Sequence, residues 1–183
     1  MNSFYDRNIV QHQVHEQSLF TDLYLRLKKP VYQYIWKMTN DKMLAEDLLQ
    51  DVFIRCYQSF DRLSDTSAAV SYIFKAARNA VFMYYRSKST HKDSFAVQDI
   101  SVLELPDTET LESQYERNEV ARLIQGYLNR VPEQLREIYL LKEYSGLSYQ
   151  EIATVTGLEV SQVKSALFRI RQKLILYLEK MVK

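Results

Sequence analysis

Apolar residues recur every three or four positions between residues 19 and 89, which is the spacing of one face of an α-helix. The first run contains Leu23, Leu27, Val31 and Ile35, and the second contains Leu44, Leu48, Val52, Cys56 and Phe60. Between the two runs, the Asn40-Asp41 pair predicts the N-cap of the second helix. The polar segment 61–67 (DRLSDTS) predicts a loop, and the aromatic-rich segment after it predicts a third helix over about 68–86.

The helical pattern breaks between residues 89 and 113 and then resumes. This segment has no sustained period and contains Pro106 with several Ser, Thr and Asp residues, so it predicts a linker. Ser113 and Glu116 have the spacing of a capping box, which predicts a helix that opens there and reaches about Leu128.

Proline, glycine and capping residues mark the ends of further helices in the rest of the chain. Pro132 predicts a helix in which it is the first helical residue, and Gly146 predicts the end of that helix. Ser148 and Glu151 form a second capping box, and the last helix is predicted to begin near residue 159 or 160. The apolar stripe of this last helix is Val163, Leu167, Ile170, Leu174 and Leu178.

The pattern predicts an all-α protein of two small helical domains joined by a flexible acidic linker. The predicted ranges are an N-terminal tail at 1–18, a first domain at 19–89, the linker at 90–113 and a second domain at 114–183. Three glycines and three prolines in 183 residues disfavour a turn-rich all-β fold. The sequence shows no membrane span and no signal peptide, and its single cysteine fits the cytoplasm, where we expect the protein to act.

Charge is distributed unevenly, although the net charge is only +1. Residues 15–90 and residues 114–183 each carry 11 basic and 8 acidic side chains. The segment between them carries Asp93, Asp99, Glu104, Asp107, Glu109 and Glu112 against Lys92. Two basic modules joined by an acidic strip suggest that each module faces a polyanion. A solvated charged surface is the simpler alternative, and charge alone does not decide between them.

Residues 149–168 (YQEIATVTGLEVSQVKSALF) have the spacing of a helix-turn-helix. Ala153 is small where the second helix crosses, and Gly157 supplies the backbone freedom of the turn. The outward face of the second helix carries Ser161, Gln162, Lys164, Ser165, Phe168, Arg169 and Arg171. Such a face suits a DNA major groove, with short polar side chains near bases and cations near phosphates. A helical hairpin that only packs is the alternative.

The longer stretch 131–174 (VPEQLREIYLLKEYSGLSYQEIATVTGLEVSQVKSALFRIRQKL) resembles region 4 of the extracytoplasmic-function sigma factors. The resemblance implies that the last helix reads the minus-thirty-five promoter element. Two positions depart from the family pattern. Glu159 stands where family members often have a serine that caps the helix, and Ala166 stands where an arginine is common.

Residues 44–60 (LAEDLLQDVFIRCYQSF) resemble region 2.2 of the same family, the helix that docks on the clamp of RNA polymerase. Within them, Glu46, Asp47, Gln50 and Asp51 recur at three- and four-residue spacing and form one polar stripe. An isolated stripe of this kind is usually only the solvent face of an amphipathic helix. The resemblance implies that this one binds core polymerase.

Residues 68–86 (AAVSYIFKAARNAVFMYYR) are similar to region 2.3, which opens the minus-ten element. Single-stranded DNA needs stacking platforms and cations, and this segment supplies Tyr72, Phe74, Phe82, Tyr84 and Tyr85 with Lys75, Arg78 and Arg86. Asn79 matches the family asparagine near the flipped base, and the loop from Asp61 to Ala69 corresponds to the base pocket. The predicted minus-ten residues are Asp61, Tyr72, Lys75, Arg78, Asn79 and Arg86. Tyr72 replaces the usual tryptophan, and Met83 replaces a frequent aspartate.

The resemblance implies an alternative sigma factor, which directs promoter-specific transcription initiation, as in stress responses. The implied partners are core RNA polymerase, through its β′ clamp and β flap, and promoter DNA. Family members are also commonly held inactive by an anti-sigma protein, often membrane-anchored. We expect no cofactor and no small-molecule substrate.

An enzyme and a stand-alone DNA-binding regulator are the alternatives to this interpretation. The sequence contains no Gly-rich phosphate loop, no HExxH and no CxxC pair, so neither catalysis nor a metal site is expected. His12, His15 and His91 fall in the predicted tail and linker, and Cys56 sits in an apolar run. A dimeric helix-turn-helix repressor or activator is the stronger alternative. Residues 44–86 argue against it, because such a regulator has no need of them.

Overall fold

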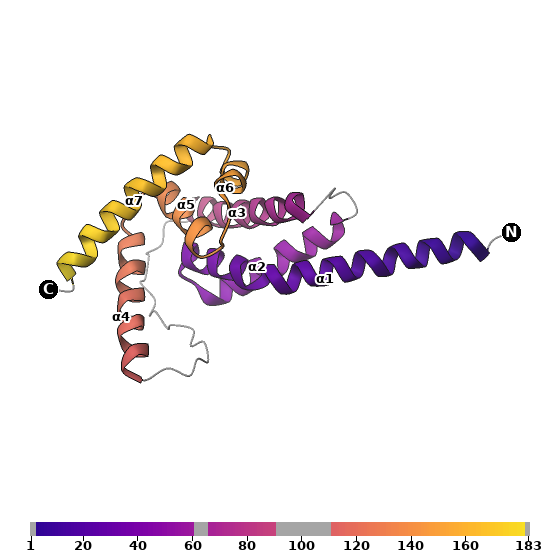
Figure 1. Ribbon diagram of the computed structural model, residues 1–183, viewed down its shortest axis with the longest axis horizontal. Coiled ribbons are helices and arrows are strands. Elements are labelled where there is room, and N and C mark those ends of the chain that lie inside the picture. Colours follow the sequence, from indigo (N-terminus) through magenta and orange to yellow (C-terminus); the bar gives the residue numbers. More distant parts are fainter. Residues whose placement is uncertain (1–2, 61–65, 91–110, 182–183) are drawn as a thin grey trace. The chain divides into compact units, whose positions relative to one another are not determined.

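The described part of the chain is helical apart from short connections. The computed structural model describes residues 3–60, 66–90 and 111–181, and the side chains within 17–60, 67–87 and 119–181. These residues contain seven α-helices and no strand, which confirms the predicted all-α class (Figure 1). The chain divides into two compact units, Met1–Lys92 and Asp93–Lys183. Most of the predicted linker lies outside the described residues.

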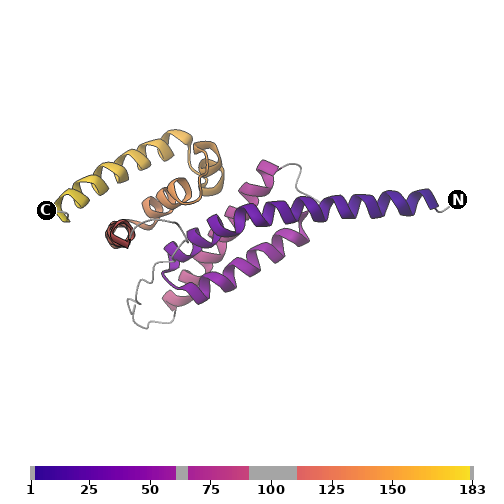
Figure 2. The ribbon, with the colours of Figure 1, turned by 60° about the horizontal axis from the view of Figure 1, so that its bottom comes forward.

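The first unit contains three helices, α1 (Ser3–Thr39), α2 (Lys42–Gln58) and α3 (Thr66–Thr90). Each of them packs against the other two, and the N-terminal part of α1 projects beyond α2 and α3 (Figures 1 and 2). Asp41 caps α2 as predicted, because its Oδ1 accepts the backbone N–H of Leu44 at 3.1 Å. Asn40, just before it, adopts a left-handed φ of 60°, which asparagine tolerates better than most residues.

The core of the first unit draws on all three helices. The most deeply buried side chains are Val31, Tyr34, Ile35 and Met38 of α1, Ala45, Val52 and Cys56 of α2, and Ile73, Phe74, Ala77 and Val81 of α3. The predicted four-residue repeat of α1 is therefore confirmed, since Leu23 and Leu27 are buried as well. Burying each large apolar side chain contributes about 1.5–3 kcal/mol, so this contact surface determines how the helices are rotated.

Aromatic rings join α1 to the C-terminal half of α2 and to Phe60 just after it. The Phe20 ring lies edge-on at 5.0 Å from the ring of Tyr57 and 5.5 Å from that of Phe60. The Tyr24 ring lies 4.9 Å from that of Phe53, also edge-on. Such pairs contribute about 0.5–1.5 kcal/mol beyond their buried area. They hold α2 with its opposite side turned to solvent.

The second unit contains four helices, α4 (Leu111–Leu128), α5 (Glu133–Glu143), α6 (Tyr149–Thr156) and α7 (Val160–Met181). Helix α7 packs against each of the other three. Its predicted apolar stripe is confirmed, because Val163, Leu167, Ile170 and Leu174 are buried and Leu178 is half-buried. The second unit is thus organised around one face of α7.

Three predicted helix boundaries were wrong. Helix α1 begins at Ser3, within the segment 1–18 that was predicted to be a tail. Helix α4 begins at Leu111, so it includes the end of the predicted linker, and Ser113 lies inside the helix instead of capping it. Pro132 occupies the N-cap of α5 and not its first helical position. Good helix formers such as Glu16, Gln17, Leu111 and Glu112 precede the predicted starts of α1 and α4, and a boundary at a proline shifts easily by one residue.

Cys56 is fully buried in the core of the first unit, as its place in the apolar run predicted. Burial raises the pKa of its thiol from 9.0 to about 11, because the thiolate loses hydration. In the unfolded chain the thiol therefore ionises at lower pH than in the folded chain. The stabilisation from burying this thiol is complete below pH 9 and declines as the pH rises from 9 to about 11.

We predict that Cys56 reacts slowly with iodoacetamide in the folded protein. A pKa shifted from 9.0 to about 11 leaves about a hundredfold less thiolate at pH 8, and burial blocks access as well. Labelling at pH 8, quantified by mass spectrometry, should be at least about a hundredfold slower in buffer than in guanidinium chloride. Similar rates in the two conditions would contradict a closed core around α2.

Candidate functional site

One side of α2 is polar and open to solvent. The side chains of Glu46, Asp47, Gln50 and Asp51 are all exposed on it. They are termed the α2 stripe below. The buried residues of the helix are Ala45, Val52, Phe53 and Cys56. The structure therefore brings together, on one surface, the four residues that the sequence predicted to bind a protein partner.

Two exposed apolar side chains extend the α2 stripe at its ends. Met43 is 80% exposed and Ile54 is 55% exposed. Successive spacings of four, three and four residues separate Met43, Asp47, Gln50 and Ile54, so all four lie on one face of the helix. Neither residue was predicted from the sequence, although the same spacing indicates them. A protein partner that covered the α2 stripe would bury these two side chains as well, which would add apolar contact to the polar one.

The outward side of α3 combines cations, an amide and aromatic rings. Lys75, Asn79 and Arg86 are exposed, and Tyr72, Arg78 and Phe82 are half-buried. These six residues are termed the α3 face below. The guanidinium carbon of Arg78 lies 4.6 Å from the centre of the Phe82 ring, a cation–π contact. The predicted minus-ten residues that the structure describes thus lie on one helix face.

The five aromatic rings predicted on α3 divide between core and surface. Phe74 is fully buried. The Tyr85 hydroxyl donates a hydrogen bond to the backbone carbonyl of Met38, which ties α3 to the end of α1. The Tyr72 hydroxyl donates to Ser59 Oγ at 3.2 Å, at the end of α2. Phe74 is therefore a core residue, and two of the tyrosines are held by contacts within the unit.

Two further predicted features concern the surroundings of the α3 face. Asp61 and most of the segment 61–69, the predicted base pocket, lie outside the described residues. Met83, where the family pattern often has an aspartate, is 63% exposed. An apolar side chain thus stands beside the α3 face.

Helices α6 and α7 form the predicted helix-turn-helix. Ser148 Oγ accepts the Glu151 backbone N–H at 3.2 Å, and Glu151 Oε2 accepts the Ser148 backbone N–H at 2.8 Å. Both halves of the predicted capping box are therefore present. Gly157 ends α6 with a left-handed φ of 76°, which favours glycine strongly. Ala153 is buried in this unit, as the crossing predicted.

The side of α7 opposite its buried stripe is open to solvent. Ser161, Gln162, Lys164, Ser165, Phe168 and Arg169 are exposed, and Arg171 is half-buried. These seven residues are termed the α7 face below. Phe168 is 65% exposed and adds a large apolar ring to an otherwise polar surface. Gln172 is also exposed and lies four residues after Phe168, beyond these seven residues.

Arg171 is engaged by an acid from another helix. Its Nε donates to Glu143 Oε1 at 3.0 Å, and its Nη2 donates to the same oxygen. The hydrogen bond that Arg171 donates to Glu143 is the main reason that the pKa of Arg171 is raised. Glu143 lies at the end of α5, 28 residues away in the sequence. The pair therefore depends on how α5 packs against α7.

Two lysines flank the ring of Tyr149, the first residue of α6. The ammonium groups of Lys142 and Lys164 lie 5.0 Å and 5.7 Å from its centre. Lys142 Nζ also donates to the backbone carbonyl of Leu147 at 3.0 Å. These residues come from α5, α6 and α7, and the sequence did not predict a role for Lys142 or Tyr149. Lys142 thus extends the cationic surface of the α7 face from Lys164 onto α5.

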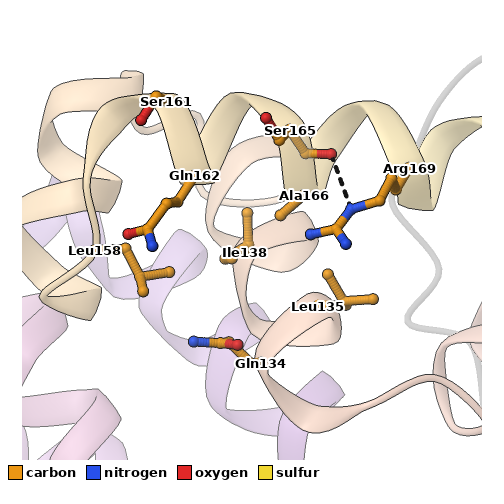
Figure 3. A pocket seen from close by; sticks show the side chains of 9 residues that line it. All are labelled: Gln134, Leu135, Ile138, Leu158, Ser161, Gln162, Ser165, Ala166 and Arg169. Atoms are coloured by element: carbon orange, nitrogen blue, oxygen red, sulfur yellow. Dashed lines mark hydrogen bonds between the residues drawn. The ribbon is translucent and has the colours of Figure 1, made fainter.

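An open hollow of about 350 Å³ lies between α5 and the α7 face (Figure 3). Its apolar lining is Leu135, Ile138, Leu158 and Ala166, and its polar lining is Gln134, Ser161, Gln162, Ser165 and Arg169. Arg169 Nε donates to the backbone carbonyl of Ser165 at 3.4 Å. Ala166, at the position where the family often has arginine, is only 4% exposed. Its small side chain belongs to the packed side of α7.

Two negative observations apply to the described residues. No group of three or more His, Cys, Asp or Glu side chains among them is arranged to hold a metal ion. None of the helices in these ranges combines the length and the apolar character needed to cross a membrane.

Comparison with known sequences matches each unit to a different part of one family. The family Sigma-70 region 2 matches residues 23–90, and Sigma-70 region 4 matches residues 121–174. The ECF RNA polymerase sigma factor SigM of Bacillus subtilis is 33% identical over 156 residues, which cover 84% of this chain and 91% of SigM. The RNA polymerase sigma factor SigZ of the same organism is 31% identical over 153 residues, or 84% of this chain and 83% of SigZ.

A solved structure has a similar fold. It contains the sigma factor RpoE of Bartonella quintana in complex with the anti-sigma factor NepR. It matches with a TM-score of 0.70 at 21% identity, covering 87% of this chain and 96% of the other. The chain belongs to the extracytoplasmic-function (ECF) sigma factors of RNA polymerase. It is an alternative sigma factor that directs promoter-specific transcription, and a stand-alone regulator is not favoured because region 2 is present.

Proposed function

We propose that three exposed surfaces divide the tasks of this sigma factor. The α2 stripe docks on the β′ clamp of core RNA polymerase, the α3 face binds the opened minus-ten strand, and the α7 face reads the minus-thirty-five duplex. One observation carries the proposal: the chain exposes a carboxylate-rich surface on one helix and cationic surfaces on two others. Phosphates repel the first and attract the others. The α2 stripe therefore suits a protein partner, and the other two suit DNA.

The proposed division follows the domains expected from the sequence. Residues 19–89 form the module for polymerase and the minus-ten element, and residues 114–183 form the module for the minus-thirty-five element and the β flap. Residues 90–113 join them, and residues 1–18 precede the first. The factor acts in the cytoplasm, with no cofactor and no catalysis of its own.

An anti-sigma protein is a further proposed partner. The similar fold of RpoE was solved with the anti-sigma factor NepR bound to it, which supports this assignment. A protein that covers the DNA-binding modules would keep the factor inactive until it is released, and a membrane anchor on that protein would retain the complex at the membrane.

The chemistry of the α7 face divides it into two groups. Lys164 and Arg169 have long cationic side chains that suit phosphates, which position the protein without reading sequence. Ser161, Gln162 and Ser165 are shorter and lie near the start of the helix, where base edges come closest in a major groove. Phe168 offers an apolar contact of the kind that recognises a thymine methyl group.

Run-off transcription is the direct test of the proposed function. Purified core polymerase from the source bacterium should start transcription at specific promoters only when this chain is added. Each of the variants described below should then be altered in a different step of initiation, namely core binding, duplex binding or promoter opening. Specific duplex binding by the chain alone, without any gain of initiation by core polymerase, would favour a stand-alone regulator instead.

The docking prediction concerns Asp51, the last residue of the α2 stripe. Charge reversal in Asp51→Lys should weaken binding to core polymerase at least about tenfold, because it places a cation where the clamp is expected to bind a carboxylate. Binding is measured by competition with the fluorescently labelled parent chain. Asp22→Lys, an exposed acid on α1, is the matched control and should compete normally. An Asp51→Lys variant that competes as well as the control would remove the α2 stripe from the interface.

The phosphate prediction uses the pair between Arg171 and Glu143. Glu143→Gln should release the guanidinium for a phosphate, so that the holoenzyme binds all duplexes more tightly and the salt slope steepens by up to about one unit. Glu179→Gln removes the same charge from an exposed site on α7 and is the matched control. Adding Arg171→Ala to Glu143→Gln should abolish the gain. A gain that persists in the double variant would show that net charge, and not Arg171, is responsible.

The opening prediction concerns Asn79, which is exposed on the α3 face. Its amide can pair with a base edge only after the base leaves the stack, so Asn79→Ala should slow open-complex formation on duplex promoters. A pre-melted bubble already bears the cost of unpairing, so activity there should largely recover. Permanganate footprinting and run-off transcription on matched templates make the comparison.

Lys75→Ala is the contrasting variant for this experiment. Because it loses a phosphate contact, this variant should bind duplex and bubble templates less tightly to the same extent. Normal melting of the duplex by Asn79→Ala would place the base selectivity elsewhere in segment 61–86.

A further inference from the structure

Gln162 has an unusual position on the α7 face, because its side chain takes part in starting the helix. It is the third residue of α7, and its Oε1 accepts the backbone N–H of Glu159 at 2.9 Å. This bond satisfies one of the donors that a helix N-terminus leaves without a partner. The Gln162 side chain is nevertheless exposed, and its amide points into the mouth of the hollow beside Leu158 (Figure 3).

The bond to Glu159 fixes which end of the amide faces outward. A backbone N–H can only donate, so its partner must be the carbonyl oxygen of the side chain and not the NH2 group. The two N–H donors of Gln162 Nε2 therefore remain for another partner. Holding the amide in this orientation also removes much of the side-chain freedom that a base contact would otherwise have to restrict.

A glutamine held in this way has different base-reading chemistry from a free one. A free glutamine pairs with adenine through both ends, donating to N7 and accepting from the N6 amino group. Here the Glu159 N–H uses one of the two lone pairs of the carbonyl oxygen and holds that oxygen against the start of the helix, so it does not face outward with the Nε2 donors. Only acceptors in the major groove suit the remaining donors, namely N7 and O6 of guanine, N7 of adenine and O4 of thymine.

We infer that Gln162 reads one base pair of the upstream promoter element by donation alone, recognising an acceptor and no amino group. This inference rests on the proposed reading of the minus-thirty-five duplex by the α7 face. It assigns a second role to one side chain, which starts the helix with its oxygen and reads DNA with its nitrogen.

The test uses the holoenzyme and a DNA probe that is altered one atom group at a time. A promoter library randomised upstream of the minus-ten element first yields the preferred sequence. Each preferred base is then replaced by an analogue that lacks either a groove acceptor (N7, O6 or O4) or a groove amino group (N6 of adenine or N4 of cytosine). At one base pair, removing the acceptor should weaken binding about two- to tenfold, the range for one neutral hydrogen bond.

Two variants of Gln162 separate capping from reading. Gln162→Ala loses both the cap and the donors. Gln162→Glu keeps an oxygen for the Glu159 N–H but has no donor, so helicity measured by circular dichroism should match that of the parent chain. Both variants should lose the sensitivity to acceptor removal at that one base pair and keep it elsewhere. Gln172→Ala, which removes an exposed glutamine farther along α7, should keep the sensitivity to acceptor removal at that base pair.

Three results would count against the inference in different ways. If removal of an amino group weakens binding at that base pair and Gln162→Ala abolishes the effect, the carbonyl reads DNA and donation alone is wrong. If both variants keep the full analogue pattern of the parent chain, Gln162 does not read a base, although the α7 face still does. If no upstream analogue affects the parent holoenzyme at any position, the proposed duplex reading by α7 fails as well.

Discussion

Burial of the apolar stripe of α7 is the constraint on which the second unit depends. Val163, Leu167 and Ile170 pack among α4, α5 and α6, and each contributes about 1.5–3 kcal/mol. Turning α7 by one residue would rotate it by about 100° and exchange buried positions for exposed ones. No single hydrogen bond at the surface could offset that loss. Packing of the core therefore fixes the rotation of α7, and this rotation decides which side chains face the proposed DNA site.

In the first unit, core packing likewise decides which side chains are exposed, and it leaves two surfaces open to solvent. Edge-on aromatic contacts hold α2 against α1, which turns the α2 stripe outward, and the buried Phe74 turns the α3 face outward. Carboxylates gather on one helix and cations on the other. This separation allows one small three-helix unit to offer a protein-binding surface and a DNA-binding surface without the first repelling the ligand of the second.

Several side chains assigned to DNA already have partners within the protein. Arg171 is paired with Glu143, Lys164 lies over the ring of Tyr149, and the Gln162 oxygen caps α7. Such contacts fix the positions of long side chains before DNA arrives, which lowers the conformational entropy lost on binding. They also restrict what each group can recognise, since an occupied acceptor or a neutralised cation is no longer fully available. The surface is thus specified as much by internal contacts as by residue type.

Local patterns determined the all-α class, the Asp41 cap, the capping box at Ser148, the turn at Gly157 and the buried stripe of α7. These features depend on residues three or four apart, so the sequence alone specifies them. The spacing of Glu159 and Gln162 belongs to the same kind of signal, although it was missed. The starts of α1 and α4 were predicted wrongly, because good helix formers such as Glu16, Gln17, Leu111 and Glu112 stand just before the predicted starts and continue both helices toward the N-terminus. The pair of Arg171 with Glu143 and the stacking of Lys142 and Lys164 on Tyr149 were decided only by tertiary structure. Each joins residues from different helices, and their distances depend on how those helices cross, which no local pattern records.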